Sequence, residues 1–177
     1  MTTALIVIDV QKGFDEPFWG KRNNPDAESN IKALLDAWQE RREPIVLVHH
    51  DSPKPESPLR PGQEGNDFQS ILDGVRADLV FGKKVNSAFH GDVDLDGWLK
   101  TRGITSIVIA GIQTNMCCET TARVGGNLGY DVTFALDATY TFDLEGLTAD
   151  QLSEATAANL GGGGFAKVVK TRDVLAR

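Results

Sequence analysis

Short runs of apolar, largely β-branched residues recur along the chain, and they constrain its fold more than any other feature. Six runs are present, at residues 4–9, 44–50, 77–82, 106–112, 131–137 and 166–171. Each run is continuously apolar and does not alternate with polar residues, which is typical of strands covered on both faces. The sequence therefore predicts a sheet buried between two layers of helices.

Helical patterns fill most of the intervals between the predicted strands. Apolar residues spaced to lie on one helix face predict helices over residues 26–42, 94–102, 117–128 and 148–160. Strands that alternate with helices favour a parallel sheet with right-handed crossovers. We therefore expect an α/β fold, a three-layer α/β/α sandwich of Rossmann type around a mainly parallel sheet of about six strands.

The length and charge of the chain limit its organisation and partners. At 177 residues and 41% hydrophobic, it can bury one substantial core, so we expect a single domain over residues 1–177. The 25 acidic and 18 basic residues give a net charge of -7 without any block of like charge. This balance argues against a nucleic-acid or anionic-membrane partner and leaves small molecules open.

The location of the protein is predicted from its start and its cysteines. No apolar run approaches the roughly 20 residues of a membrane span, and the opening residues read as a first strand and not as a secretion signal. The two cysteines, Cys117 and Cys118, are adjacent and cannot form a disulfide framework. We expect reduced thiols and a cytoplasmic protein.

Polar residues follow three of the predicted strands. Asp9 closes the first run, Lys83 and Lys84 follow the third, and Cys117 follows the fourth after a short turn. The carboxyl ends of parallel strands meet at one edge of a sheet, where such sheets bind their ligands. We therefore expect these side chains to lie near one another.

The residue types at this edge suit acyl transfer. A helix start and a nearby lysine would favour the thiolate of Cys117, and Asp9 in reach could take the thiol proton and later return it to a leaving amine. Each residue also has a structural interpretation. A strand-end aspartate can cap a loop, a lysine pair can lie in solvent, and a cysteine in an apolar helix can belong to the core.

The sequence resembles the isochorismatase-like cysteine hydrolases, the superfamily of nicotinamidases, N-carbamoylsarcosine amidohydrolase and ureidoacrylate amidohydrolase. The resemblance runs over essentially the whole chain and is carried by ALIVIDVQKGF, KKVNSAFHGDVDLDGWLKTRGITSIVIAGIQTNMCCETTARVGGNLGYDV and DATYTFD. The family motif G-x-x-T-x-x-C-V-x-x-T-x-R is matched at Gly111, Thr114, Cys117, Thr121 and Arg123. The resemblance implies the isochorismatase-like version of the predicted fold.

The resemblance also implies roles for single residues. Cys117 falls on the family nucleophile, Asp9 on its catalytic aspartate, and Lys83 rather than Lys84 on its lysine. The family has a cis peptide before the cysteine, which here would join Ile112 to Gln113. The backbone amides of Gln113 and Cys117 are then candidates for an oxyanion hole.

Cys118 takes the place of the family's usual valine, and we expect it to be a packing residue. Gly125 and Gly126 stand where the family often has alanine or bulkier residues, so we expect looser helix packing there.

Two predicted loops, residues 11–25 and 51–66, follow the first two strands and could cover the site. Phe14 and Trp19 in the first loop, and Arg60 in the second, are candidates for a substrate pocket. Arg60 could bind a substrate carboxylate. The aromatic residues could equally pack a loop core or a subunit interface.

A metal site is not expected. Some nicotinamidases bind a divalent ion, and His49, His50 and Asp51 end the second predicted strand. Adjacent side chains on a strand point to opposite faces, so the two histidines should not reach one ion. The aspartate–histidine–histidine spacing of those relatives is also missing. We expect neither a metal nor another cofactor.

The resulting hypothesis is a cysteine-dependent hydrolase of a carbon–nitrogen bond in a small amide or carbamoyl compound, acting through a thioester on Cys117. The resemblance implies a homo-oligomer, either a dimer or a tetramer. One alternative is hydrolysis of a vinyl ether, although isochorismatases of that type typically lack the cysteine. Another is a non-enzymatic flavodoxin-like binding or thiol redox protein, in which Cys118 would matter as much as Cys117.

Overall fold

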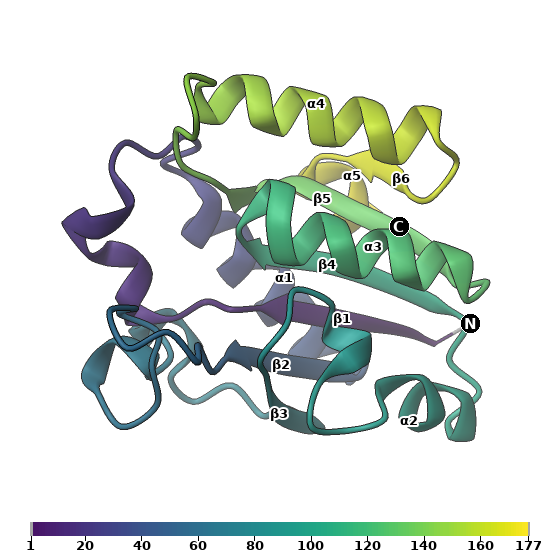
Figure 1. Cartoon of the computed structure of the whole chain (residues 1–177). Helices are drawn as coiled ribbons and strands as arrows, with labels where there is room; N and C mark the ends of the chain where they lie inside the picture. Colours follow the sequence, from purple (N-terminus) through teal and green to yellow (C-terminus); the bar gives the residue numbers. More distant parts are fainter. Residues whose placement is uncertain (1, 177) are drawn as a thin grey trace.

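Six strands form one parallel sheet in the computed structural model, which describes residues 2–176 (Figure 1). The strand order is β3-β2-β1-β4-β5-β6, and every neighbouring pair runs parallel. The strands are β1 Thr3–Ile8, β2 Ile45–His50, β3 Leu79–Lys83, β4 Ser106–Ile112, β5 Asp131–Tyr140 and β6 Lys167–Val169. The predicted six-stranded sheet is confirmed. The predicted domain of residues 1–177 includes residues 1 and 177, which lie outside the described part.

Helices cover both faces of the sheet, as the continuous apolar runs predicted. The helices are α1 Ala27–Arg41, α2 Leu95–Thr101, α3 Glu119–Asn127, α4 Ala149–Gly162 and α5 Thr171–Leu175. Helices α1 and α5 pack on one face, while α2, α3 and α4 pack on the other (Figure 1). Successive strand residues serve the two cores in turn: Leu5 and Val7 face α1, whereas Ile6 and Ile8 face the opposite layer. The three-layer sandwich is therefore confirmed.

The last predicted strand, residues 166–171, is only partly correct. Strand β6 ends at Val169, and Thr171 begins helix α5. The carboxylate oxygen Oδ1 of Asp137 accepts hydrogen bonds from the Thr171 amide at 2.6 Å and from its hydroxyl at 2.8 Å. This interaction from the neighbouring strand β5 turns the chain out of the sheet, which no local pattern of residues 166–171 reveals.

The glycines of α3 make the packing there tighter, which is the opposite of the expectation for Gly125 and Gly126. A Cβ atom at Gly125 would lie 3.2 Å from Ile107 Cδ1 and 3.3 Å from Phe89 Cε2. At Gly126 it would lie 2.5 Å from the carbonyl oxygen of Phe165. The missing side chains therefore let the helix approach the sheet and the chain after α4.

The carboxyl ends of the strands lie at one edge of the sheet, on the left of Figure 1, together with the long loops after β1 and β2. The strand order reverses at β1, which has β2 on one side and β4 on the other. Ligands of open parallel sheets bind at such a reversal. Among the described residues, the helices are all too short or too polar to span a membrane.

Candidate active site

Asp9, Lys83 and Cys117 come from three separate strand ends and meet in the interior. The Lys83 ammonium nitrogen Nζ lies 2.6 Å from Asp9 Oδ2 and 3.2 Å from Cys117 Sγ. Asp9 and Lys83 are 0% exposed, and Cys117 is 8% exposed. The structure therefore brings together a carboxylate, an ammonium and a thiol, shielded from bulk water.

The backbone fixes the position of each group. Asp9 directly follows β1 with a φ of 54°, an uncommon conformation for a residue with a side chain. Its amide donates to the Val48 carbonyl at 2.8 Å, which ties it to the end of β2. Lys83 is the last residue of β3 and is buried, whereas the next residue, Lys84, is exposed. Alternation along the chain thus places Lys83, and not Lys84, beside Asp9.

Cys117 lies in a π-helical turn, Thr114–Cys118, that joins β4 to α3. The predicted helix of residues 117–128 therefore divides into the end of this turn and α3. The peptide bond between Ile112 and Gln113 is cis, and the side chains of Gln113 and Cys117 both face the same cavity. Such π-helical turns occur frequently at functional sites.

The thiol of Cys117 favours its protonated form, contrary to the expectation from its place at a helix start. Burial raises the pKa of Cys117 well above its ordinary value, and the charge of Asp9 raises it further, while Lys83 opposes them. Burial by itself would lower the pKa of Lys83, but the charge of Asp9 and the hydrogen bonds to Asp9 and Cys117 raise this pKa. The resting site thus pairs an ammonium with a carboxylate beside a neutral thiol.

One carboxylate oxygen of this site is available to accept a proton. Asp9 Oδ2 is engaged by Lys83, whereas Oδ1 is buried without a hydrogen-bond partner among residues 2–176. A buried acceptor without a partner is costly and uncommon in a folded protein. A carboxylate oxygen of Asp9, a ring nitrogen of His50 and the sulfur of Cys117 lie within 4.8 Å of one another, so the carboxyl group is close to the thiol.

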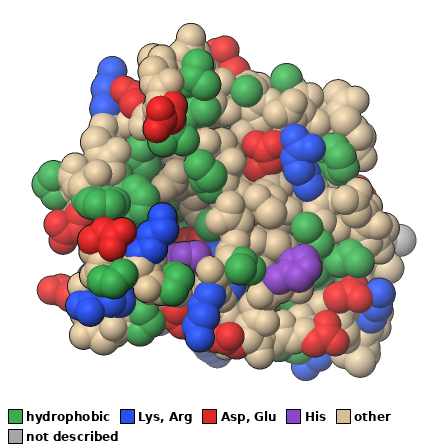
Figure 2. All heavy atoms as spheres, viewed as in Figure 1, with side chains coloured by type: hydrophobic (Ala, Val, Ile, Leu, Met, Phe, Trp, Pro, Cys, Tyr) green, Lys and Arg blue, Asp and Glu red, His purple; other side chains and the backbone are tan. Residues whose placement is uncertain are grey.

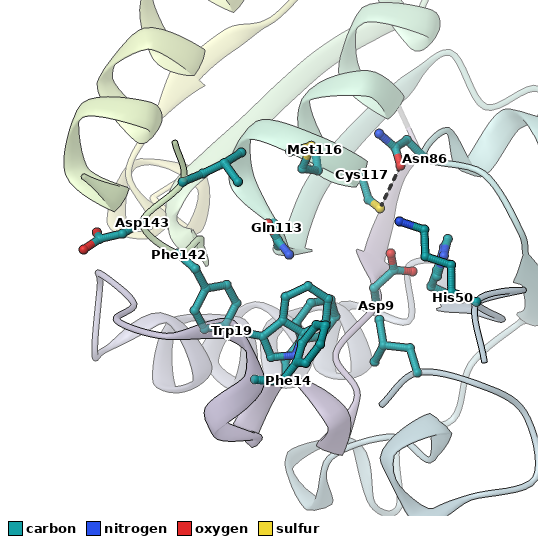
Figure 3. A pocket seen from close by; sticks show the side chains of 14 residues that line it. Asp9, Phe14, Trp19, His50, Asn86, Gln113, Met116, Cys117, Phe142 and Asp143 are labelled. Carbon is teal, nitrogen blue, oxygen red and sulfur yellow. Dashed lines mark hydrogen bonds between the residues drawn. The ribbon is translucent and has the colours of Figure 1, made fainter. Parts of the chain in front are cut away.

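A cavity of about 590 Å³ opens above these groups, a volume suited to a small organic molecule (Figure 3). Its apolar lining comprises Phe14, Phe18, Trp19, Leu59, Met116, Phe142 and Leu144, and its polar lining comprises Asp9, His50, Lys54, Asn86, Gln113, Cys117 and Asp143. Figure 2 shows hydrophobic side chains gathered around a hollow on the left, over the loops that follow the strands. The cavity can therefore hold an apolar group next to the thiol.

The aromatic wall is a packed cluster. The Trp19 ring lies 4.8 Å from Phe14 and 5.7 Å from Phe142, measured between ring centroids. The Trp19 indole nitrogen donates to the Gly13 carbonyl at 2.7 Å, which fixes the ring. Phe14 and Trp19, the two candidate pocket residues of the first loop, line this cavity. Arg60 does not: it is exposed and lies outside the lining, and Lys54 of the same loop lines the cavity instead.

Two polar residues of the site were not singled out from the sequence. Asn86 Oδ1 accepts a long hydrogen bond from the Cys117 thiol, with 3.9 Å between oxygen and sulfur (Figure 3). His50 Nδ1 lies 3.3 Å from Lys83 Nζ. Asn86 lies between Lys83 and Ser87, in a stretch that carries the family resemblance. Its position in the sequence could therefore have marked it as a site residue. His50 was considered only as a metal ligand.

The two adjacent histidines diverge, as strand alternation predicted. His49 Nδ1 lies 3.0 Å from Asp51 Oδ1, whereas His50 lines the cavity. Asp9, His50 and Cys117 have the mutual spacing of a metal-ligand set. However, the Lys83 ammonium contacts all three and places a positive charge where a cation would sit.

Cys118 belongs to the core and not to the cavity. Its side chain is 0% exposed and packs with the layer formed by α2, α3 and α4. Burial raises the pKa of Cys118 well above its ordinary value, and both cysteines are free thiols. An accessible vicinal redox pair does not fit this arrangement.

Comparison with known proteins agrees with the fold and identifies the family. The family profile described as Isochorismatase domain matches residues 3–172. The isochorismatase family protein YrdC of Bacillus subtilis is 39% identical over 157 residues, which cover 89% of this chain and 83% of YrdC. Nicotinamidase 3 of Arabidopsis thaliana is 31% identical over 179 residues, covering 94% of this chain and 83% of that protein.

A solved structure is similar over nearly the whole length. It is a hydrolase of the isochorismatase family from Chromobacterium violaceum, with a TM-score of 0.91 and 37% sequence identity. The match covers 99% of this chain and 92% of that one. The profile match, the relatives and the shared fold lead to one conclusion: the chain belongs to the isochorismatase family of hydrolases.

Proposed function

We propose that the protein hydrolyses a carbon–nitrogen bond of a small amide or carbamoyl compound through a thioester on Cys117. The observation that carries this proposal is the buried Lys83 ammonium, which contacts both Asp9 Oδ2 and Cys117 Sγ, and Asp9 and Cys117 line the cavity. A nucleophile, a base and a group that positions them both are the elements of covalent acyl transfer. The relative nicotinamidase 3 is by its name an amidase, which agrees with this chemistry.

In the proposed reaction, Asp9 Oδ1 takes the proton of the Cys117 thiol as the sulfur attacks the carbonyl carbon. The carbonyl double bond opens and its electron pair moves to oxygen, where the backbone amides of Gln113 and Cys117 stabilise the negative charge. The carbon–nitrogen bond then breaks, and the leaving nitrogen takes the proton from Asp9. An amine or ammonia departs, and an acyl thioester remains on Cys117.

Water completes the proposed cycle by the same groups. Asp9 removes a proton from water as the water oxygen attacks the thioester carbon. The carbon–sulfur bond breaks, the acid product departs, and Asp9 returns the proton to sulfur. The net reaction converts one amide and one water into one acid and one amine, so atoms and protons balance without another reactant.

Lys83 holds the charges of this cycle in balance. With a neutral thiol, its ammonium pairs with the Asp9 carboxylate at 2.6 Å. When the proton moves to Asp9, the negative charge moves to sulfur, which lies 3.2 Å from the same ammonium. One fixed cation therefore stabilises both states, because close charges interact strongly in a buried site.

Two alternatives fit the site less well. Hydrolysis of a vinyl ether needs no thiol nucleophile, yet Cys117 lies at the cavity floor in contact with Lys83. A thiol redox protein would need Cys118 to be accessible, and this residue is 0% exposed.

Assembly and location belong to the same proposal. We propose a cytoplasmic homo-oligomer of single-domain subunits, residues 1–177, in which a second copy covers part of the cavity mouth. Phe18 and Leu144 line this cavity and are 61% and 43% exposed, which is unusual for large apolar side chains beside a pocket. Light scattering after size exclusion tests the assembly, and a monomeric mass at micromolar concentration would contradict it.

The test of the activity is a panel of small amides and carbamoyl compounds, nicotinamide included, with ammonia release as the readout. A Cys117→Ala variant should fold and release no ammonia above the buffer rate. A Cys118→Ala variant, whose side chain lies outside the cavity, should retain turnover. Equal rates for the wild type and Cys117→Ala would overturn the proposal.

A further inference from the structure

The Lys83 ammonium has three hydrogen-bond partners for its three N–H donors. They are Asp9 Oδ2 at 2.6 Å, Cys117 Sγ at 3.2 Å and His50 Nδ1 at 3.3 Å. A lysine ammonium donates and never accepts. His50 Nδ1 must therefore accept, which requires that this ring nitrogen carry no proton.

This contact fixes both the charge and the tautomer of His50. A neutral imidazole carries one N–H, so with Nδ1 unprotonated the proton resides on Nε2. The electrostatics agree, because burial lowers the pKa of His50 and the charge of Lys83 lowers it further. His50 thus presents an N–H donor on the side of its ring away from Lys83.

The backbone of His50 is held by the side chains of Gln11 and Asn66. Gln11 is 0% exposed; its Oε1 accepts from the His50 amide at 2.8 Å, and its Nε2 donates to the His50 carbonyl at 3.2 Å. Asn66 Nδ2 donates to the same carbonyl at 3.1 Å. Buried polar networks of this kind fix the orientation of the residue that they hold.

Nε2 of His50 has no hydrogen-bond partner among residues 2–176, and the His50 side chain lines the cavity (Figure 3). Its only side-chain hydrogen bond within these residues is the one between Nδ1 and Lys83. We propose that His50 positions Lys83 through Nδ1 and donates its Nε2–H to an acceptor atom of the substrate. This inference rests on the proposed hydrolase function and adds a substrate requirement, a hydrogen-bond acceptor beside the scissile group.

The tautomer can be tested without any substrate. Long-range proton–nitrogen correlation spectra of the uniformly ¹⁵N-labelled wild type distinguish protonated from unprotonated ring nitrogens of the histidines, and a His50→Asn spectrum assigns the signals. At neutral pH we expect His50 to be neutral with the proton on Nε2. A proton on Nδ1, or on both nitrogens, would overturn the inference.

Two substitutions separate the two roles. Asn at position 50 places an acceptor oxygen near the position of Nδ1 but nothing at Nε2, whereas Gln reaches the position of Nε2 and leaves Nδ1 empty. On an amide that the wild type hydrolyses, we expect His50→Asn to raise KM about tenfold with kcat within threefold, the loss of about one hydrogen bond to substrate. We expect His50→Gln to lower kcat at least tenfold with a smaller change in KM.

His49→Asn is the matched control, because His49 pairs with Asp51 and does not line the cavity. It should leave kcat and KM within twofold of the wild type. The assignment of roles would be overturned if His50→Asn and His50→Gln had equal kcat values. It would also be overturned if KM rose no more in His50→Asn than in His50→Gln. If no amide in the panel is hydrolysed, the proposed function fails, and the spectra alone decide the tautomer of His50.

Discussion

The Lys83 ammonium lies 2.6 Å from Asp9 Oδ2, and both side chains are fully buried. Removing a charge from water costs free energy, and in a buried pair the attraction between opposite charges offsets this cost. The offset is lost when either partner is removed. The second contact of the ammonium, to Cys117 Sγ at 3.2 Å, connects this ion pair to the proposed nucleophile. The same contacts that allow the charges to be buried thus arrange the chemistry.

Asp9→Asn should cost both stability and activity. The substitution leaves the Lys83 charge buried without its partner, and breaking a buried pair in this way typically costs about 3 to 5 kcal/mol. Urea titration followed by circular dichroism measures the loss. Asp36→Asn, which removes an exposed ion pair with Lys32, is the control and should change stability little. Similar small losses for the two variants would contradict a buried ion pair at Asp9.

Gly111→Ala should be strongly destabilising. Gly111 has a φ of 131°, and a Cβ atom there would lie 2.0 Å from the carbonyl oxygen of Ile8 in the adjacent strand β1. A methyl group would force β4 away from β1 just before the cis peptide. We expect a loss of more than about 2 kcal/mol in the free energy of unfolding.

Gly161→Ala in helix α4 is the matched control, because nothing lies within 4 Å of its Cβ position and its φ is not positive. This variant should be more stable than the wild type by about 0.5 to 1 kcal/mol, since alanine favours a helix interior over glycine. An unchanged free energy of unfolding in Gly111→Ala would contradict the close approach of β4 to β1 at this position.

Trp19→Ala should weaken substrate binding, whereas Arg60→Gln should not. Trp19 supplies an apolar wall of the cavity, and loss of about 1.4 kcal/mol of contact would raise KM roughly tenfold. Arg60 is exposed and outside the lining, so its replacement should leave kcat/KM within twofold. Steady-state kinetics on the same amide measure both, and a large effect of Arg60→Gln would restore it as a substrate-binding residue.

His50 should make stability depend on pH in mild acid. Burial and the charge of Lys83 lower its pKa from the ordinary value of 6.5; His49 adds to this, while Asp9 and Asp51 oppose it. Below about pH 6.5 the unfolded chain binds a proton that the folded chain refuses. The stability from neutral His50 is therefore fully present above that pH and is lost as pH falls through the folded-state pKa.

Unfolding free energies of the wild type and His50→Asn between about pH 8 and pH 5 measure this contribution, because Asn cannot titrate. The wild type should lose more stability than the variant over that range. Parallel curves would mean that His50 does not resist protonation in the folded protein.

The sequence was sufficient for the sheet and for the residues at its edge. Continuous apolar runs predicted strands buried on both faces. In the structure α1 covers one face of the sheet and α3 the other. Asp9, Lys83 and Cys117 follow strand ends, and parallel strands bring their ends to one edge whatever the connecting loops do. The sheet and the meeting of its strand ends could be predicted from local pattern and topology, whereas the choice of Lys83 over Lys84 came from the family resemblance.

The remaining features depend on contacts between distant segments. The end of β6 is set by Asp137, and the pKa of Cys117 is set by burial and by Asp9. Arg60 and Lys54 lie in one loop, and only its folded path places Lys54 at the cavity and Arg60 in solvent. Likewise His50 gains its role from Lys83 in the neighbouring strand.

The most direct test of the central claim is the intact mass of the protein during turnover. The enzyme is mixed with a hydrolysed amide, quenched in acid within the first turnovers, and digested to locate any adduct. We expect an acyl mass on Cys117 in the wild type and in Cys118→Ala, and none in Cys117→Ala. Two results would contradict a thioester on Cys117. One is ammonia release that leaves no acyl adduct on the wild type and is undiminished in Cys117→Ala, and the other is an acyl adduct on a different residue.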